Sequence, residues 1–116
     1  MTFSTNSNGV DAIQAIFTTH GVGSKKILLD RFSNSSGITQ IAHTTIQDGE
    51  VIIPHRHIDM EEFFFILEGN VEFEIDNEKF LLTNNSFVFV PKGKMHGLKH
   101  TGLIPCKLIS FSSLVR

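Results

Sequence analysis

Two histidines separated by a single residue, His55 and His57, have the types and spacing best suited to chemistry in this chain. β-Forming residues surround them, and strand side chains repeat their direction at every second position, so both imidazoles are expected on one face. After a polar break at residues 58–60, Glu61 or Glu62 opens a second apolar run that can return antiparallel to the first. A carboxylate would then lie beside two imidazoles, a set that suits a divalent transition metal and leaves coordination positions open.

A third imidazole, that of His96, follows another apolar stretch far downstream, in the segment Pro91–His96. Three histidines and one glutamate would complete the coordination shell of one ion. Neutral imidazoles and one carboxylate leave a divalent ion with a net charge of about +1, which attracts an anionic ligand with two oxygens, such as a keto-acid, enolate or catechol-like group. The ligand set does not choose among Fe, Mn, Ni, Co, Cu and Zn.

Other polar residues near these positions are weaker candidates. His100 is the candidate catalytic residue, because it follows the ligand segment and could orient a ligand or act as a base, although a structural surface role is favoured. His43 lines the interior or lies outside it, and a structural role is favoured there too. His20 is interpreted as an exposed loop residue. Arg56, between the two candidate ligands, should point away from the metal towards solvent.

Composition limits the class of protein. The chain has 116 residues, 41% of them hydrophobic and 19% charged, with a formal net charge of −2. These values are typical of one globular domain that buries about two-thirds of its unfolded surface. Residues 1–9, rich in Ser, Thr and Asn, are predicted to form a flexible N-terminus, and residues 10–116 a single domain. The chain contains no Tyr and no Trp, so no phenol can act as an acid, base or radical.

The same composition disfavours several partners. Ten Lys and Arg residues are scattered without a basic stripe, so we expect no nucleic-acid partner. No apolar run is long enough to span a membrane, and the first residues lack a signal-peptide pattern, so we expect a cytoplasmic protein without a membrane partner. The single cysteine, Cys106, cannot form an intrachain disulfide and is expected to be buried and inert.

Short strands must position the candidate ligands. About nine short segments at spacings of about 8–12 residues, separated by turn residues, predict an antiparallel sandwich or barrel. For residues 10–17 a short strand and a helical turn compete. The other expected strands cover residues 25–32, 38–46, 51–57, 62–67, 71–75, 79–82, 87–90 and 107–114. The strand at 87–90 is expected to be buried.

The segment 49–69 resembles the first motif of the cupin family, which has the pattern Gly, five residues, His-x-His, three or four residues, Glu, six residues, Gly. Its fixed positions are matched by Gly49, His55, His57, Glu62 and Gly69. The six-residue count before Gly69 favours Glu62 over Glu61. Glu61 stays a reserve ligand, but as a neighbour on the strand it should point to the other face and be solvated.

The segment 85–100 resembles the second cupin motif, which has the pattern Gly, five residues, Pro-x-Gly, two residues, His, three residues, Asn. Pro91, Gly93 and His96 stand at the right offsets. Asn85 replaces the first Gly and His100 replaces the final Asn. Asn tolerates the left-handed backbone that Gly often supplies, and neither departure touches the ligand set.

The resemblance implies an all-β fold, a double-stranded β-helix or jelly-roll barrel of antiparallel strands with a short N-terminal extension, and one metal ion. Its metal ligands would be His55, His57, Glu62 and His96. It also implies a homodimer, with residues 10–32 as a candidate interface. The expected function is a metal-dependent enzyme, a dioxygenase or other oxygenase or an isomerase/lyase, acting on a small anionic or aromatic metabolite. The alternative is a non-catalytic small-molecule binding or sensing protein; a transcription regulator would need a helical DNA-reading segment that the sequence lacks.

Overall fold

Ten β-strands and one short 3-10 helix make up the part of the chain that the computed structural model describes, residues 6–18 and 20–115. Turn residues separate nearly all of them, as the sequence predicts. In chain order they are η1 (Val10–Ala12), β1 (Ile16–Phe17), β2 (Ser24–Asp30), β3 (Ile38–Ile46), β4 (Val51–His55), β5 (Met60–Glu68), β6 (Asn70–Ile75), β7 (Glu78–Leu82), β8 (Phe87–Val90), β9 (His96–Thr101) and β10 (Cys106–Leu114).

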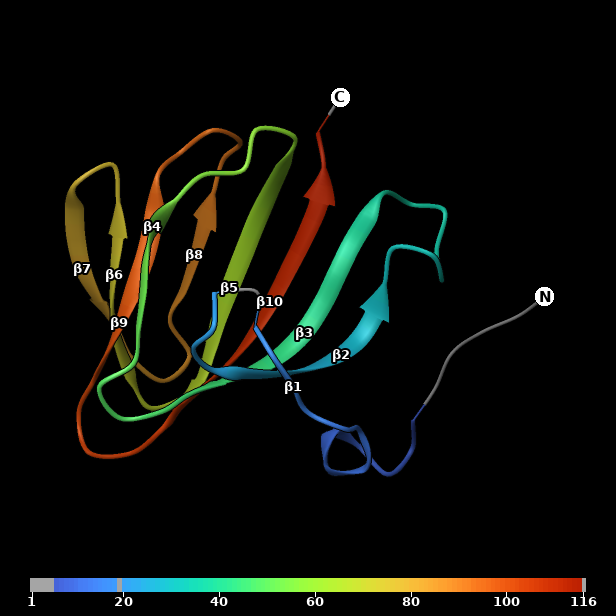
Figure 1. Cartoon of the computed structure of the whole chain (residues 1–116), viewed down its shortest axis with the longest axis horizontal. Coiled ribbons are helices and arrows are strands. Elements are labelled where there is room, and N and C mark those ends of the chain that lie inside the picture. The colour runs from blue at the N-terminus through green and yellow to red at the C-terminus, as the bar shows by residue number, and fades with distance from the viewer. Residues whose placement is uncertain (1–5, 19, 116) are drawn as a thin grey trace.

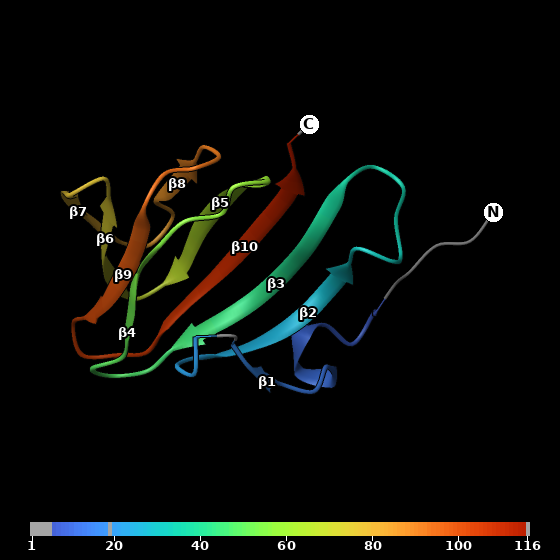
Figure 2. The same cartoon turned by 45° about the horizontal axis from the view of Figure 1, so that its top comes forward.

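The strands form two sheets that face each other as two layers (Figures 1 and 2). The larger sheet has the order β1-β2-β3-β10-β5-β8 and the smaller sheet the order β4-β9-β6-β7, with antiparallel pairing throughout. The predicted all-β jelly roll of antiparallel strands is therefore confirmed. Within the described residues no strand pairing joins the two sheets, so they form a sandwich and not a closed barrel.

The hydrophobic core lies between the two sheets. On β10, Cys106 and Leu108 are buried while Lys107 between them is exposed, as the alternating direction of strand side chains requires. Each large apolar side chain buried in this way contributes about 1.5–3 kcal/mol to folding. The buried apolar residues of the core are Ile46, Ile66, Val71, Phe73, Leu82, Val90, Leu98, Cys106 and Leu108.

Several strand predictions agree closely with the structure. The bounds of β3 and β8 coincide with the predicted segments 38–46 and 87–90. In residues 10–17 both competing predictions hold, since a 3-10 turn precedes a two-residue strand. The prediction that β8 is buried holds for one face only: Val90 is 2% exposed, but β8 is the edge strand of the larger sheet, and Phe87 and Phe89 are 62% and 48% exposed.

The connection between β4 and β5 differs from the prediction. β4 pairs with β9, whereas β5 pairs with β10 and β8 in the other sheet, so the expected antiparallel pairing of β4 with β5 does not form. The chain crosses from one sheet to the other over residues 56–59. Each of the two runs turns one face towards the core, so they lie on opposite sides of it.

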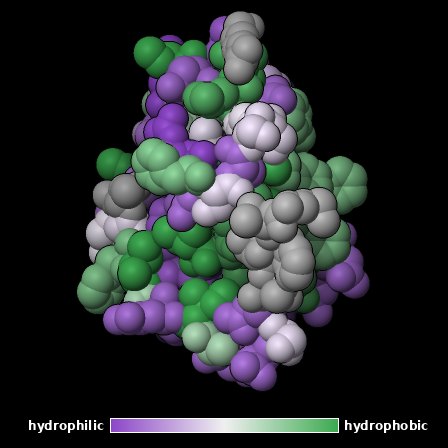
Figure 3. Space-filling model, turned by 90° about the vertical axis from the view of Figure 1, so that its right-hand side faces the viewer, coloured by the Kyte–Doolittle hydropathy of each residue, from purple (hydrophilic) through white to green (hydrophobic). Residues whose placement is uncertain are grey.

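The surface near the N-terminal segment carries several exposed apolar side chains. Phe17 is 84% exposed and Phe32 90% exposed. Figure 3 views this side of the molecule, where hydrophobic and hydrophilic groups are interspersed. Among the described residues, no helix has the length and apolar character needed to cross a membrane.

Candidate metal centre

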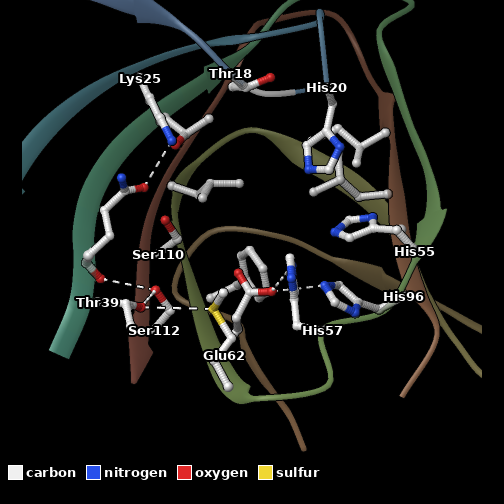
Figure 4. Close-up of a pocket in the computed structure, with 18 of the residues that line it drawn as sticks. Thr18, His20, Lys25, Thr39, His55, His57, Glu62, His96, Ser110 and Ser112 are labelled. Carbon is white, nitrogen blue, oxygen red and sulfur yellow. Dashed lines mark hydrogen bonds and ion pairs between the residues drawn. The ribbon is translucent and has the colours of Figure 1, made fainter. Parts of the chain in front are cut away.

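Four side chains that the sequence singles out, His55, His57, Glu62 and His96, converge between the sheets (Figure 4). One potential ligand atom from each lies within 4.8 Å of all the others. Donors bonded to one ion at about 2.0–2.2 Å lie within about 4.4 Å of one another, so small side-chain rotations would bring all four onto one ion.

The two sheets divide the cluster between them. His55 ends β4 and stands opposite His96, the first residue of β9, in the register of the smaller sheet. His57 follows β4 in the crossing segment, and Glu62 lies on β5 of the larger sheet. The ring centroids of His55 and His57 are 5.0 Å apart and those of His55 and His96 are 4.5 Å apart. The imidazoles therefore gather on one side, and the carboxylate reaches them from the other.

Main-chain carbonyls orient two of the imidazoles. Nδ1 of His55 lies 3.0 Å from the Ile53 carbonyl oxygen, and Nδ1 of His96 lies 3.0 Å from the Lys94 carbonyl oxygen. A carbonyl oxygen only accepts hydrogen bonds, so Nδ1 carries the proton in both rings. In the neutral rings Nε2 is then free to bind a metal, the arrangement in which metal-binding histidines are usually held.

Glu62 lies where a cation is needed. Its Oε1 atom is 3.0 Å from Nε2 of His57 and 3.1 Å from Nε2 of His96. Because Nδ1 of His96 donates to a carbonyl, a neutral His96 would point the Nε2 lone pair at a carboxylate oxygen. Two acceptors at this distance require a proton or a metal ion between them. The donor set therefore fits a metal that takes imidazole and carboxylate ligands.

The electrostatics of the cluster agree with this geometry. Burial raises the pKa of Glu62, but the hydrogen bond with His96 and the charges of the histidines outweigh it, so the pKa lies below its ordinary value. Burial lowers the pKa of His96, but the hydrogen bond and charge of Glu62 and the bond to Lys94 outweigh it and raise the pKa. Burial lowers the pKa of His55. The ionised Glu62 and the neutral His55 are the forms that bind metals, whereas the raised pKa of His96 favours a proton between His96 and Glu62 that a metal ion would have to replace.

A cavity of about 360 Å³ opens in front of the cluster. Its size suits a small molecule. Phe73 stacks on His96, with ring planes 7° apart and centroids 6.3 Å apart, and Phe64 lies beside the same ring. The apolar part of the lining comprises Ile46, Ile52, Phe64, Phe73, Leu98 and Leu108.

His100 does not join the cluster. It is 4% exposed, so the surface position predicted for it is wrong. Its Nε2 lies 2.7 Å from the Ile104 carbonyl oxygen, its Nδ1 lies 3.6 Å from Asp48 Oδ1, and it does not line the cavity. The contact with Ile104 fixes the turn between β9 and β10 against β9, the strand that carries His100.

The remaining polar candidates also lie away from the cluster. His43 sits on β3 between the buried residues Ala42 and Thr44, which places its side chain on the outer face of the larger sheet. Arg56 is exposed, with Nε 3.3 Å from Sδ of Met95. Glu61 lines a second groove together with Phe63 and Phe89.

The cavity has further polar lining residues that the sequence did not indicate. His20, expected as an exposed loop residue, is exposed, but its ring centroid lies 4.3 Å from that of His55 and its side chain lines the cavity. Lys25, Gln40 and Ser110 line it as well. No motif marks these residues, because strand pairing in the larger sheet alone brings them near the cluster.

Comparison with known proteins identifies relatives of part of the chain. The model of the cupin domain matches residues 42–112. An uncharacterised protein of Methanocaldococcus jannaschii is 30% identical over 77 residues, which are 66% of this chain and 62% of that protein. The alginate biosynthesis protein AlgA of Pseudomonas putida is also 30% identical over 77 residues, but these make up only 16% of its length. The tetracenomycin polyketide synthase protein TcmJ of Streptomyces glaucescens is 23% identical over 87 residues, 75% of this chain and 58% of that protein.

Solved structures share the fold at low sequence identity. A predicted oxalate decarboxylase from Thermotoga maritima superposes with a TM-score of 0.84 at 17% identity, covering 97% of this chain and 100% of the other. The cupin domain of Schizosaccharomyces pombe Cnp3 gives a TM-score of 0.79 at 13% identity, covering 92% of this chain and 72% of the other. A RmlC-like cupin from Shewanella frigidimarina gives 0.74 at 18% identity, with 91% and 87% covered.

Proposed function

Because the chain belongs to the cupin family, whose domain model matches residues 42–112, we propose that it is a metal-dependent enzyme of the oxygenase or isomerase/lyase type. Its substrate would be a small anionic or aromatic metabolite. The observation that carries the proposal is the placement of Glu62 Oε1 3.1 Å from the Nε2 atom of His96, whose other ring nitrogen donates to a carbonyl. That arrangement, next to a cavity of about 360 Å³, supports a site built for a cation and a small ligand.

His55, His57, Glu62 and His96 would hold the ion, and four protein donors would leave coordination positions open for ligand oxygens. When bound, a divalent transition metal supplies a Lewis acid or a site for oxygen. The chain itself positions the ligand and limits water. Phe64 and Phe73 pack beside His96, and the apolar lining excludes solvent from one side of the cluster.

A non-catalytic binding or sensing protein is the second candidate. The observation that favours it is the position of His100, since the residue proposed as a base bonds to Ile104 and lies outside the cavity lining. Such a protein would hold a metal and a small ligand in the same cavity without turnover.

Two screens on one preparation separate these candidates. Oxygen consumption by the Fe-loaded protein, together with product analysis for isomerase or lyase activity, reports turnover across a panel of small acids and phenols. Thermal-shift measurements on the same panel report binding. If a compound both stabilises the fold and is turned over, the result supports the enzyme. If every compound that stabilises the fold is left unchanged, the result supports the binding protein.

A further inference from the structure

The cavity wall opposite the imidazoles is polar. Figure 4 shows Lys25 and Ser110 on the side away from His55 and His96. Gln40, on β3, accepts a hydrogen bond from Lys25, on β2, with 3.0 Å between Oε1 and Nζ. Neighbouring strands of the larger sheet therefore present an amine, an amide and a hydroxyl to the same space.

The Lys25 amine lacks a neutralising carboxylate within the described part of the chain. No Asp or Glu oxygen lies within 4.0 Å of its nitrogen among the residues that the structure describes. Its side chain is half-buried; burial lowers its pKa, and the more distant charge of Glu62 opposes that effect. A half-buried ammonium without a counter-ion is stabilised by an anion that enters the cavity.

Lys25 also differs from its neighbour on the strand. Lys26 points to the opposite face, where its amine donates to the Val10 carbonyl oxygen at 2.8 Å. That face holds His43, which pairs with Lys26 in the β2–β3 register. The chain thus places one lysine of the pair in the cavity and one outside it.

We propose that Lys25, held by Gln40, binds a carboxylate at the far end of the substrate while the metal takes the near end. The inference rests on the proposed function and narrows its substrate class to short dicarboxylates, of which 2-oxo-dicarboxylic acids also offer the metal two oxygens. The hydroxyl of Ser110 lies on the same wall as a further donor. Apolar residues such as Ile46 and Leu108 in the lining suit the methylene groups between the two ends.

The test compares matched acids by calorimetric titration of the metal-loaded full chain. 2-Oxoglutarate and 2-oxoadipate carry the second carboxylate, and 2-oxopentanoate and 2-oxohexanoate have the same carbon chains without it. We expect at least one dicarboxylate to bind about 10- to 100-fold more tightly than its monoacid, the range for a hydrogen bond to a charged group. Lys25→Met should make the dicarboxylate bind no more tightly than its monoacid, without changing the affinity for the monoacid. Lys26→Met, the control, should preserve the difference between the two acids.

Three results would overturn the inference: equal affinities within each pair, an unchanged ratio in Lys25→Met, or no binding of any of the four acids. The unchanged monoacid affinity shows that Lys25→Met is folded. Metal analysis of the same samples separates the two proposals. If the wild-type chain takes up metal but binds each dicarboxylate no more tightly than its monoacid, only the role of Lys25 is refuted. If the chain takes up no metal, the proposed function and this inference are both refuted.

Discussion

Gly97 lies directly against the carbonyl oxygen of Ile52. A Cβ atom built on Gly97 would be 2.5 Å from that oxygen and 2.9 Å from the Pro54 nitrogen, closer than real contacts allow. This approach occurs where β4 and β9 place His55 opposite His96. A residue without a side chain therefore sets the spacing of two candidate ligands.

Gly97→Ala should push β4 away from β9. We expect a loss of about 1–3 kcal/mol in the free energy of unfolding, typical of overpacking, together with reduced metal content. Chemical denaturation and elemental analysis measure the two effects. Gly37→Ala is the control, because a Cβ there meets open space although its φ of 91° strains any side chain. It should lose stability without losing metal, and an equal metal loss in both variants would contradict the prediction.

The double variant His55→Ala/His57→Ala should lose nearly all bound metal. It removes two of the four candidate ligands and leaves an incomplete shell. Elemental analysis of protein purified without chelator measures the metal per chain. His43→Ala, a substitution on the outer face of the same protein, should keep the wild-type content. Equal metal content in the double variant and the wild type would refute the site.

His100→Ala should lower stability and leave metal content unchanged. The substitution removes the buried His100 ring and its partly buried hydrogen bond of 2.7 Å to the Ile104 carbonyl oxygen, and we expect a cost of about 1–3 kcal/mol. Denaturation gives the free energy of unfolding, and any activity found in the screens should survive in the folded variant. A fully stable variant that has lost turnover would restore His100 as a catalytic residue.

Cys106 should be unreactive in the folded protein. It is fully buried, and burial raises the pKa of its thiol to about 11. Because the unfolded chain ionises this thiol above its ordinary pKa of 9.0 while the folded chain keeps the proton, the thiol's contribution to stability falls as the pH rises from about 9 to 11. Wild type should lose stability relative to Cys106→Ala across that window, and thiol reagents at pH 8 should label it only after denaturation. Rapid labelling of the native chain would contradict this.

The homodimer expected from the family resemblance stays a prediction, with residues 10–32 as its candidate interface. Phe17 and Phe32, both within that segment, are 84% and 90% exposed and are the side chains there that a partner subunit would cover. Light scattering at micromolar concentration should give twice the chain mass, and Phe17→Ser/Phe32→Ser should shift it towards the monomer. A monomeric wild type would contradict the predicted homodimer.

Sequence reasoning predicted most of the strands because their residues alternate or form apolar runs. β9 escaped it, since the run His96–Thr101 mixes His, Gly, Lys and Thr and only its pairing with β4 and β6 makes it a strand. The predicted pairing of β4 with β5 was wrong for a similar reason, because the periodicity of a strand does not indicate which sheet it joins.

The four candidate ligands were identifiable because their spacing fits the two family motifs, and the structure brings those residues together. The other polar residues of the cavity were not identifiable. His20 and Lys25 stand outside both motifs, and only the folding of β1 and β2 onto the edge of the larger sheet brings them to the cavity. The local sequence pattern predicts whether a segment forms a strand, whereas the long-range pairing of strands decides which residues it contacts.

The division of the cluster between two sheets affects how the two layers of the sandwich are held together. The three imidazoles belong to the β4–β9 side, and Glu62 alone comes from the opposite layer. A bound ion would therefore cross-link the two layers, with Glu62 as the ligand from the larger sheet. Removing the ion with a chelator would remove that cross-link and lower the stability of the sandwich.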